Sequence, residues 1–501
     1  MQVHLLGHAS LFVETEDCKI LIDPVLQDPF CEGLNESCPQ RLITPENFPE
    51  YDFLVISHRH LDHFDLRSLA YLPKNVDVLI PQDNLIKDCL LQLGYSQIYP
   101  LADFTKVRSG STMMMTTRSE VRVPEFGIVI KDSSGVFWNT VDTFFAPQTI
   151  AKVKENFPEI DFLLTTWHIS LEGKYQYNQP VSFPYELYNY LLKLIEVIEP
   201  KAIAPGAQGF KYIGSSAWQN KVVFPLTRER FCHDLKTAFP SLINNIFEFD
   251  PGDIVEFNSN NCAVIKQASA YSQMTVDDRE LVDFAPVVAG NDLVDRALDS
   301  RYSKKKARNA LSRNPEQFDT DLMYQKIESE ISINLPQFIQ DNLQSLFKLH
   351  QQWNIVYQLI IVFPDGEEKW YLDFTQSTVK IKSGRNALAN YFTYITASTL
   401  YSLIKRDRDW DYALCNGEYR TFQKAYLLDG TDLKYHQNVN LIDPIQLMFS
   451  SDYIANNNII QELNEFEISE KSSTKILSDS MLNLGNILIK KGKKEILHIL
   501  Y

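Results

Sequence analysis

Residues 54–65 read LVISHRHLDHFD and place three histidines and two aspartates within eight residues, directly behind an apolar run. A strand that ends at Ser57 would leave His58 and His60 on the same side of an extended turn, whereas Asp62 and His63 would turn toward a second centre. Imidazole and carboxylate groups are common ligands of transition metals. The spacing therefore predicts two adjacent metal ions rather than one.

The other histidines differ in how closely they accompany this cluster. Six of the ten lie within residues 1–168: His4, His8, His58, His60, His63 and His168. His8 lies in a predicted strand that should end near the metals, so it is expected to support a ligand carboxylate or face the substrate; a core histidine is the alternative. His4 is expected in the core, and Asp65 is expected to cap the next helix rather than bind metal.

The elements that must position these residues follow from the hydrophobic pattern. Short apolar runs such as KILIDP, FLVISH, VDVLIP, DFLLTTWH and PKAIAPG each predict a strand, and DSSG at residues 132–135 predicts a hairpin turn. The segment PVSFPYELYNYLLKLIEVIEP has Leu187, Leu191, Leu194 and Ile198 at helical spacing and should end before Pro200. This alternation over residues 1–258 predicts an α/β sandwich.

The length of 501 residues exceeds what one hydrophobic core usually serves, so more than one domain is expected. We predict a catalytic domain over residues 1–270, a helical connector over 271–350, a small α+β domain over 351–450 and a tail over 451–501. The basic cluster of Lys304, Lys305, Lys306 and Arg308 in the connector is expected to be a solvated helix face. An anionic partner is the alternative.

The motif H-x-H-x-D-H, matched by His58, His60, Asp62 and His63, resembles that of the metallo-β-lactamase-fold superfamily. The resemblance extends from residue 1 to about 257 and includes LLGHAS in the first strand and LIDPV in the second. It implies an αββα sandwich with the metal site at one edge, where loops from both sheets meet.

The same resemblance implies a carboxylate that bridges the two metals. FWNTVDT matches the superfamily's G-D-T, with Val141 in the place of glycine and Asp142 as the bridge. A carboxylate between two cations screens their mutual repulsion.

The third ligand of the first metal is the first departure from the superfamily pattern. A histidine is usual about twenty residues before the bridging aspartate, but this region contains none. Glu120 is expected to substitute, and Glu125 is the alternative. Either carboxylate could instead pair at a strand edge with Arg118 or Arg122.

The last histidine of the second metal is the other departure, because IAPGAQGF places Ala207 at that position. His168, just after a predicted strand, is expected to replace it. Otherwise water or Gln208 completes the site. Arg118 and Gln208 are further expected to support the ligands or to contact substrate.

Exchange of an imidazole for a carboxylate makes a site harder and more anionic, which favours iron or manganese over zinc. Such changes resemble those in the di-iron oxygenase branch of the superfamily, which includes the β-hydroxylase of chloramphenicol biosynthesis. EPKAIAPGAQGFKY and FPSLINNIFEFDPGDIVEF are also similar to the metallo-β-lactamase-like part of the CMP-N-acetylneuraminate hydroxylase family. The resemblance implies a di-iron, O2-dependent oxygenase that hydroxylates or N-oxygenates an organic metabolite.

Two other functions remain open at this point. The first is a dinuclear hydrolase of an ester, amide, lactone or phosphodiester, with zinc as the alternative metal. The second is a binding protein with a decayed site, which the intact motif disfavours.

Composition limits the partners. A net charge of −16 argues against nucleic acid, and IVYQLIIVF, the most apolar later stretch, is too short to span a membrane. The start of the chain lacks the pattern of a signal peptide, and the seven cysteines are scattered, so a cytoplasmic location is expected. No cluster motif is present, so electrons would come from a separate reductase or from the substrate.

The substrate is expected to be a small molecule. LIIVFPDGEEKWYLDF is similar to sterol-carrier-type domains, which implies an apolar substrate or a tethering role; a dimerisation or packing module is the alternative. The resemblance to the CMP-N-acetylneuraminate hydroxylase family implies a nucleotide-linked substrate instead.

Overall fold

The computed structural model describes residues 1–121, 123–176, 179, 181–207, 209–258, 261–284, 320–363, 365–406, 410, 413, 418–435 and 441–449. The predictions for Gln208, for the basic cluster at 304–308 and for the tail over 451–501 fall outside these residues. No helix within the described ranges is both long and apolar enough to cross a membrane.

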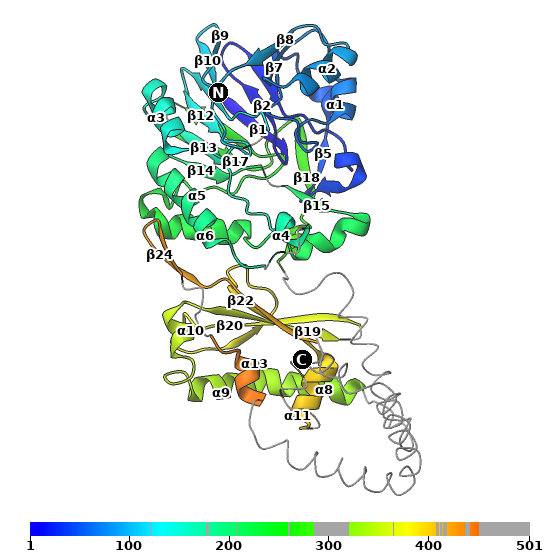
Figure 1. Ribbon diagram of the computed structural model, residues 1–501, viewed down its shortest axis with the longest axis vertical. Helices are drawn as coiled ribbons and strands as arrows, with labels where there is room; N and C mark the ends of the chain where they lie inside the picture. The colour runs from blue at the N-terminus through cyan, green and yellow to red at the C-terminus, as the bar shows by residue number, and fades with distance from the viewer. Residues whose placement is uncertain are drawn as a thin grey trace, which may run out of the picture.

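The first domain contains two sheets (Figure 1). The larger has the order β17 (Asn261–Ile265), β16 (Ile254–Asn258), β1 (Gln2–Gly7), β2 (Ser10–Glu14), β3 (Lys19–Ile22), β6 (Phe53–Val55), β7 (Asp77–Pro81) and β8 (Ile98–Leu101). The second has the order β14 (Ile203–Pro205), β13 (Phe162–Thr165), β12 (Gly135–Asn139), β11 (Ile128–Asp132), β10 (Thr112–Thr116) and β9 (Lys106–Ser109). The hairpin predicted at residues 132–135 joins β11 to β12 and is confirmed.

Alternation along the strands makes the two sheets pack face to face. In β2, Leu11 and Val13 point into the core between the sheets, whereas Phe12 points to the outer layer. That layer consists of α1 (Leu66–Tyr71) and α2 (Asn84–Gln92), and the second sheet is covered by α3 (Pro147–Asn156), α5 (Tyr185–Ile198) and α6 (Arg228–Ala238). The predicted αββα sandwich is confirmed.

Two local predictions are also confirmed. Helix α5 ends at Ile198 and buries Leu191, Leu194 and Ile198 against the second sheet. Asp65 is the N-cap of α1, because its side chain accepts a hydrogen bond from the backbone N–H of Ser68 at 3.1 Å.

Two small ladders and a short helix shape the end of the sandwich that faces the second domain. β4 (Asn35–Ser37) pairs with β15 (Phe210–Tyr212), and β5 (Gln40–Ile43) pairs with β18 (Ser272–Val276). α4 (Glu172–Gln176) lies at the same end (Figure 1).

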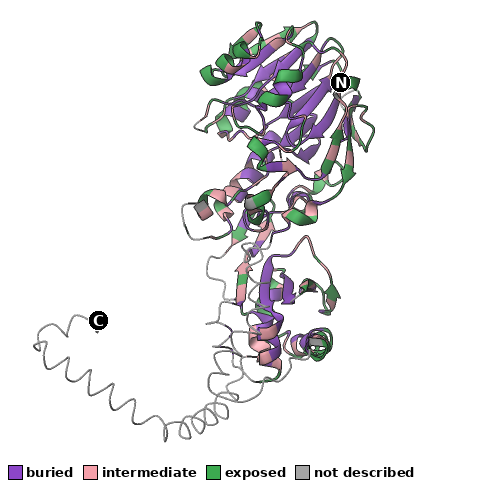
Figure 2. Cartoon of the chain, turned by 90° about the vertical axis from the view of Figure 1, so that its right-hand side faces the viewer, coloured by how far each residue is buried: buried purple, intermediate pink, exposed green. Residues whose placement is uncertain are grey.

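The C-terminal unit is built on one five-stranded sheet. Its order is β21 (Ile381–Ser383), β20 (Gly366–Asp373), β19 (Val356–Phe363), β22 (Tyr391–Thr396) and β23 (Tyr419–Gln423). One face is covered by α8 (Thr320–Ser329), a π-helical turn (Glu330–Asn334), α9 (Leu335–Asp341), α10 (Lys348–Gln352), α11 (Ala397–Ile404) and α13 (Pro444–Phe449). Figure 2 shows the buried strands of both units.

The stretch predicted as a connector over 271–350 has two different roles. Residues 272–276 form β18 and extend the first domain. Met323, Ile327, Ile331 and Leu335 are fully buried in the same core as the C-terminal sheet. The helical part therefore belongs structurally to the α+β unit.

The two units contact each other through buried groups. The hairpin β24 (Tyr426–Asp429) and β25 (Asp432–Tyr435) reaches from the C-terminal unit onto α5 (Figure 1). The hydroxyls of Tyr188 and Tyr426 donate to Asp234 Oδ2 at 2.8 and 2.5 Å, and Arg230 Nε donates to Asp234 Oδ1 at 2.9 Å. A buried charge satisfied from both units favours one fixed arrangement of the two.

His350 provides a pH test of the C-terminal core. Its ring is 1% exposed and its Nε2 atom lies 3.0 Å from the carbonyl oxygen of Ile442. Burial lowers the pKa of His350 to about 4. Between pH 6.5 and 4 the unfolded chain therefore binds a proton that the folded chain does not, so stability falls as the pH falls, by up to about 3 kcal/mol.

We therefore expect His350→Gln, which can still donate to Ile442 but does not titrate, to lose less stability than the wild type between pH 7 and 4.5. Urea denaturation at both pH values measures the difference. His233→Gln, at an exposed position of α6, should keep most of the wild-type pH dependence. If His350→Gln and the wild type lose stability equally, protonation of His350 does not contribute to acid unfolding.

Candidate metal centre

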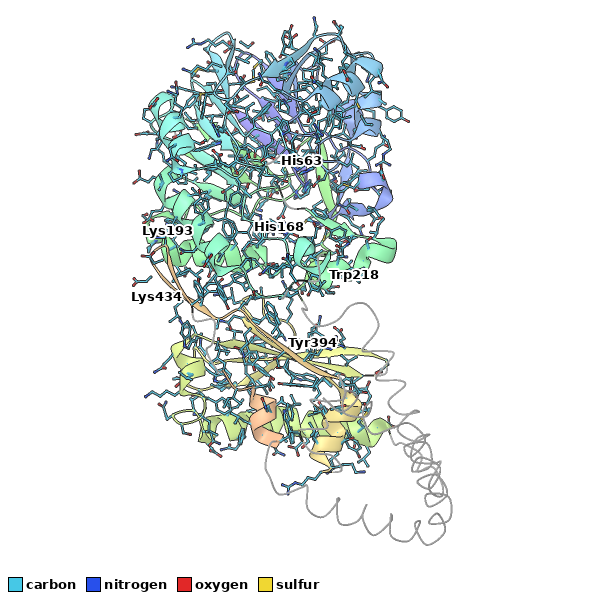
Figure 3. The ribbon with its side chains drawn as sticks, viewed as in Figure 1. His63, His168, Lys193, Trp218, Tyr394 and Lys434 are labelled. Atoms are coloured by element: carbon cyan, nitrogen blue, oxygen red, sulfur yellow. The ribbon has the colours of Figure 1, made fainter. Side chains whose placement is uncertain are left out.

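The cluster lies where loops from both sheets meet. His58, His60, Asp62 and His63 follow β6 of the first sheet, whereas Asp142 follows β12 of the second. Figure 3 shows His63 inside the first domain, with His168 closer to the C-terminal unit. His60 lies at the exposed rim, and His58 and His63 are fully buried.

His63 is oriented by a buried carboxylate. Its Nδ1 atom lies 2.9 Å from Asp23 Oδ2, and Asp23 also accepts hydrogen bonds from the backbone N–H of Ser57 at 2.7 Å and from its hydroxyl at 2.6 Å. The Nε2 atom of His63 is buried without a hydrogen-bond partner, although Asp142 Oδ2 lies 3.2 Å away. A carboxylate on one nitrogen and a free second nitrogen form the usual arrangement of a metal-binding histidine.

His58 and His60 converge in the same way. The Nδ1 atom of His58 lies 3.0 Å from the hydroxyl of Ser57, and its Nε2 atom lies 2.9 Å from His60 Nδ1. Burial, followed by the charge of His63, lowers the pKa of His58 to about 2. The ring is therefore neutral, which is the form that binds metal ions.

The carboxylates complete the donor set. His8 Nε2 lies 3.1 Å from Asp62 Oδ2, and Asp62 Oδ2 lies 3.8 Å from His63 Nε2. Burial alone would raise the pKa of Asp62 and of Asp142, yet the charge of His63 holds both below their usual value. The same carboxylates raise the pKa of His63 well above its usual value against the effect of its burial.

These donors form two overlapping groups among the described residues. The ligand atoms of His8, Asp62 and His63 lie within 4.8 Å of one another, and so do those of His58, His63 and Asp142. The carboxylates of Asp62 and Asp142 lie close together, and the Nε2 atom of His63 has no hydrogen-bond partner. Metal ions would neutralise the carboxylates and bind this nitrogen. The residues therefore fit a dinuclear metal centre.

Backbone strain accompanies the site. Val141, in the place of the motif's glycine, has a φ of 52°, a conformation that is costly for a β-branched residue. His8, Asp23 and Ala207 also have positive φ values of 46°, 44° and 50°. Each such residue costs about 1–3 kcal/mol and persists only where the surrounding fold holds it, which is typical of functional sites.

The structure does not bring Glu120 to the cluster. Its side chain is 42% exposed and pairs with Arg118, whose Nε atom lies 2.8 Å from Glu120 Oε1. Glu120 is thus placed as the strand-edge carboxylate considered above, and Arg118, 53% exposed, faces solvent with it.

Glu125 lies at the site instead. It is 8% exposed, and the backbone N–H of the next residue, Phe126, donates to the carbonyl of Ser57 at 3.2 Å, immediately before His58. Burial raises the pKa of Glu125 to about 7, with further contributions from Asp142 and Asp23. The carboxylate of Glu125 accepts a hydrogen bond from the hydroxyl of Ser119 and, like His168, joins neither ligand group, although the charges of Asp142 and His63 act on it.

His168 follows β13 and lies beside the cluster without joining either ligand group. Its Nε2 atom is buried and unpartnered, and its ring packs against Phe224 with centroids 4.7 Å apart. Burial lowers the pKa of His168 to about 4, opposed by the carboxylates of Asp142 and Asp62. A neutral, unpartnered imidazole beside these carboxylates suits a metal ligand.

Sequence reasoning missed several groups. Asp23 and Ser57 orient the histidines, and their signal was a polar residue directly after each buried strand, in LIDPV and LVISH. Burial, and then the charge of Asp62, raise the pKa of Glu172 on α4. No spacing rule connects Glu172 to the motif.

A cleft opens beside His8 and leads toward the C-terminal unit. Its apolar walls include Leu5, Trp167, Phe210, Phe224 and Leu226, and Arg228 and Arg279 lie farther along. A small molecule in this cleft would approach the cluster from the side of His8.

Comparisons with known proteins agree with this location. Residues 2–118 match the family model described as "Beta-lactamase superfamily domain". A Mycobacterium tuberculosis protein named for a Rieske 2Fe-2S centre is 30% identical over 111 residues, 22% of each chain. The N-acyl-phosphatidylethanolamine-hydrolyzing phospholipase D 1 of Caenorhabditis elegans is 36% identical over 81 residues, 15% of this chain and 21% of that one. The matches thus span about a fifth of these relatives.

Solved structures are more distant. CmlA, a diiron beta-hydroxylase from Streptomyces venezuelae, is 18% identical, with 41% of this chain and 44% of that one covered and a TM-score of 0.32. The isothiocyanate hydrolase from Delia radicum gut bacteria is also 18% identical, with 52% and 100% covered and a TM-score of 0.39. Residues 2–118, which contain His8 and the H-x-H-x-D-H motif, are therefore similar to the beta-lactamase superfamily domain.

Proposed function

We propose that this protein is a di-iron oxygenase that hydroxylates or N-oxygenates a small organic metabolite. The observation that carries the proposal is Glu125, a buried carboxylate on which the charges of Asp142 and His63 act, in the segment where the superfamily pattern has a histidine. A carboxylate in that place makes the site harder and more anionic, and such sites prefer iron or manganese to zinc.

The residues divide into two ligand sets around one bridge. His58, His60 and Glu125 would hold the first iron, and Asp62, His63 and His168 the second. Asp142, which approaches both sets, would bridge them. Two ferrous ions held in this way would supply the one-electron chemistry that O2 activation requires.

The remaining groups prepare the site for substrate. Asp23 and Ser57 hold the ligand histidines in one tautomer, and His8 holds the carboxylate of Asp62. The cleft beside His8 has apolar walls against which a small molecule could pack. Electrons would come from a separate reductase or from the substrate.

Metal analysis of anaerobically prepared protein tests the proposal. We expect two irons per chain and a visible absorption band that appears when the reduced protein is exposed to oxygen. Two zincs per chain, together with turnover in the absence of oxygen, would contradict an oxygenase.

A dinuclear hydrolase is the second candidate. It is favoured by the 36% identity to the Caenorhabditis elegans phospholipase, whose name describes hydrolysis of an N-acyl-phosphatidylethanolamine. In such an enzyme two metals lower the pKa of a water molecule that attacks the substrate. Assays with a phosphodiester and an ester under argon separate the two functions, because only the hydrolase would turn over there.

A further inference from the structure

A second cavity lies between the two units, apart from the candidate metal ligands. It is a small cavity of about 30 Å³ that opens to solvent. The first domain contributes Lys221 and Asp283, and the C-terminal unit contributes Lys369, Arg385, Asn386, Tyr394 and Lys424. Figure 3 shows Tyr394 on the side of the C-terminal sheet that faces the first domain.

The charges of this lining do not balance. Four cationic side chains and one carboxylate face the cavity. The Nε atom of Arg385 forms an ion pair with Asp283 Oδ2, and its Nη2 atom lies 3.9 Å from Glu229 Oε2. The Nζ atom of Lys369 lies 4.0 Å from Glu367 Oε2, too far for a hydrogen bond.

Two of the lysines have no carboxylate partner among the described residues. Lys221 Nζ donates to the carbonyl of Glu280 at 2.9 Å, and Lys424 Nζ donates to the carbonyl of Pro225 at 2.8 Å. Lys424 is 1% exposed and lies over the rings of Phe392 and Phe284, at 5.4 and 5.9 Å from their centroids. Burial of an ammonium group without a counter-ion is costly.

A neutral donor adds to the same surface. Tyr394 is 1% exposed, and the structure gives its hydroxyl no hydrogen-bond partner in the part of the chain that it describes. The ammonium groups and this hydroxyl line one cavity, and each ammonium group has further N–H donors beyond the carbonyl contacts described. Phosphate and carboxylate groups provide acceptor oxygens and the missing negative charge.

We propose that this cavity binds a small oxyanion, the phosphate or carboxylate group of a ligand, through Lys221, Lys369, Lys424 and the hydroxyl of Tyr394. Because Lys221 comes from the first domain and the other three residues come from the C-terminal unit, a bound oxyanion links the two. Ligand binding of this kind stabilises the folded state by mass action. None of the lining residues is a candidate metal ligand, so the site is independent of the proposed oxygenase function.

Calorimetric titration of the metal-loaded full chain with inorganic phosphate and with malonate tests this site, together with thermal unfolding in each anion. We expect saturable binding of at least one anion and a rise in Tm. Lys369→Gln should weaken binding about tenfold or more, because a hydrogen bond from a charged group is lost. Lys382→Gln, at an exposed position of β21, should leave binding unchanged.

Lys424→Met provides a second test, which distinguishes loss of anion binding from loss of folding. It removes an uncompensated buried charge, so the free chain should unfold at the same or a higher temperature, while the anion no longer raises Tm. Binding of phosphate alone identifies a phosphate ligand, and binding of malonate alone a carboxylate ligand. The proposal is overturned if neither anion binds, or if binding survives Lys369→Gln and Lys424→Met but is lost in His60→Ala, which would place the anion on the metals.

Discussion

Asp142→Asn is expected to remove most of the metal and the metal-dependent activity while the chain remains folded. The side chain keeps its shape but loses the charge beside His63 Nε2, 3.2 Å away. Loss of groups that only orient metal ligands costs about 10- to 100-fold in affinity or activity. Loss of a bridging ligand should therefore exceed 100-fold, because both metal ions lose a donor and their mutual repulsion is no longer screened.

Elemental analysis after dialysis and a metal titration measure this effect. Asp88→Asn, at an exposed position of α2, is the matched control for loss of one carboxylate and should keep the full metal content. Circular dichroism checks that the sandwich is intact. If Asp142→Asn retains two metals with unchanged affinity, Asp142 is not a bridging ligand.

The sandwich could be predicted because its signal is local. Alternation in β2 and the helical period of α5 each indicate which side chains face a core, and the structure places Leu11, Val13, Leu191 and Leu194 accordingly. The H-x-H-x-D-H motif is local too, since one loop after β6 carries all four residues.

The choice between the two glutamates could not be made from spacing, because a distance along the sequence does not describe the path of the chain. The described residues of this segment, 117–121 and 123–127, form no regular element, and backbone hydrogen bonds fix their course. The N–H of Glu120 donates to the carbonyl of Phe144, and that of Phe126 donates to the carbonyl of Ser57. The first bond leaves Glu120 at the surface, and the second ties the backbone next to Glu125 to the residue before His58.

The role of the helices over 320–352 was predictable only in part. Met323, Ile327, Ile331 and Leu335 repeat every four residues, a period that predicts a buried helical face. The charged residues around them favoured a solvated connector. That face packs against β19 and β22, which follow later in the chain, so its partner could not be read from the helical segment itself. The cavity between the units has the same origin, because Lys221 and Lys424 meet only after both units have folded.

Glu125→Gln is expected to lower the affinity of the first metal position by about 10- to 100-fold, whereas Glu120→Gln should leave it unchanged. Glu120 forms an exposed ion pair with Arg118, and such pairs contribute only about 0–1 kcal/mol. The two variants are matched, since each converts one glutamate of the same segment into its amide. Iron content after anaerobic reconstitution measures both.

Glu125→His tests the chemistry as well as the position. It restores the imidazole of the superfamily pattern, so the metal preference should shift from iron toward zinc. The pKa of Glu125, raised to about 7 by burial, adds a pH dependence. Metal must displace the proton below pH 7, so in the wild type affinity at the first position should rise as the pH increases through 7, and this rise should be smaller in Glu125→Gln. Unchanged iron content in Glu125→Gln, with loss in Glu120→Gln, would return the ligand role to Glu120 and require this segment to rearrange when metal binds.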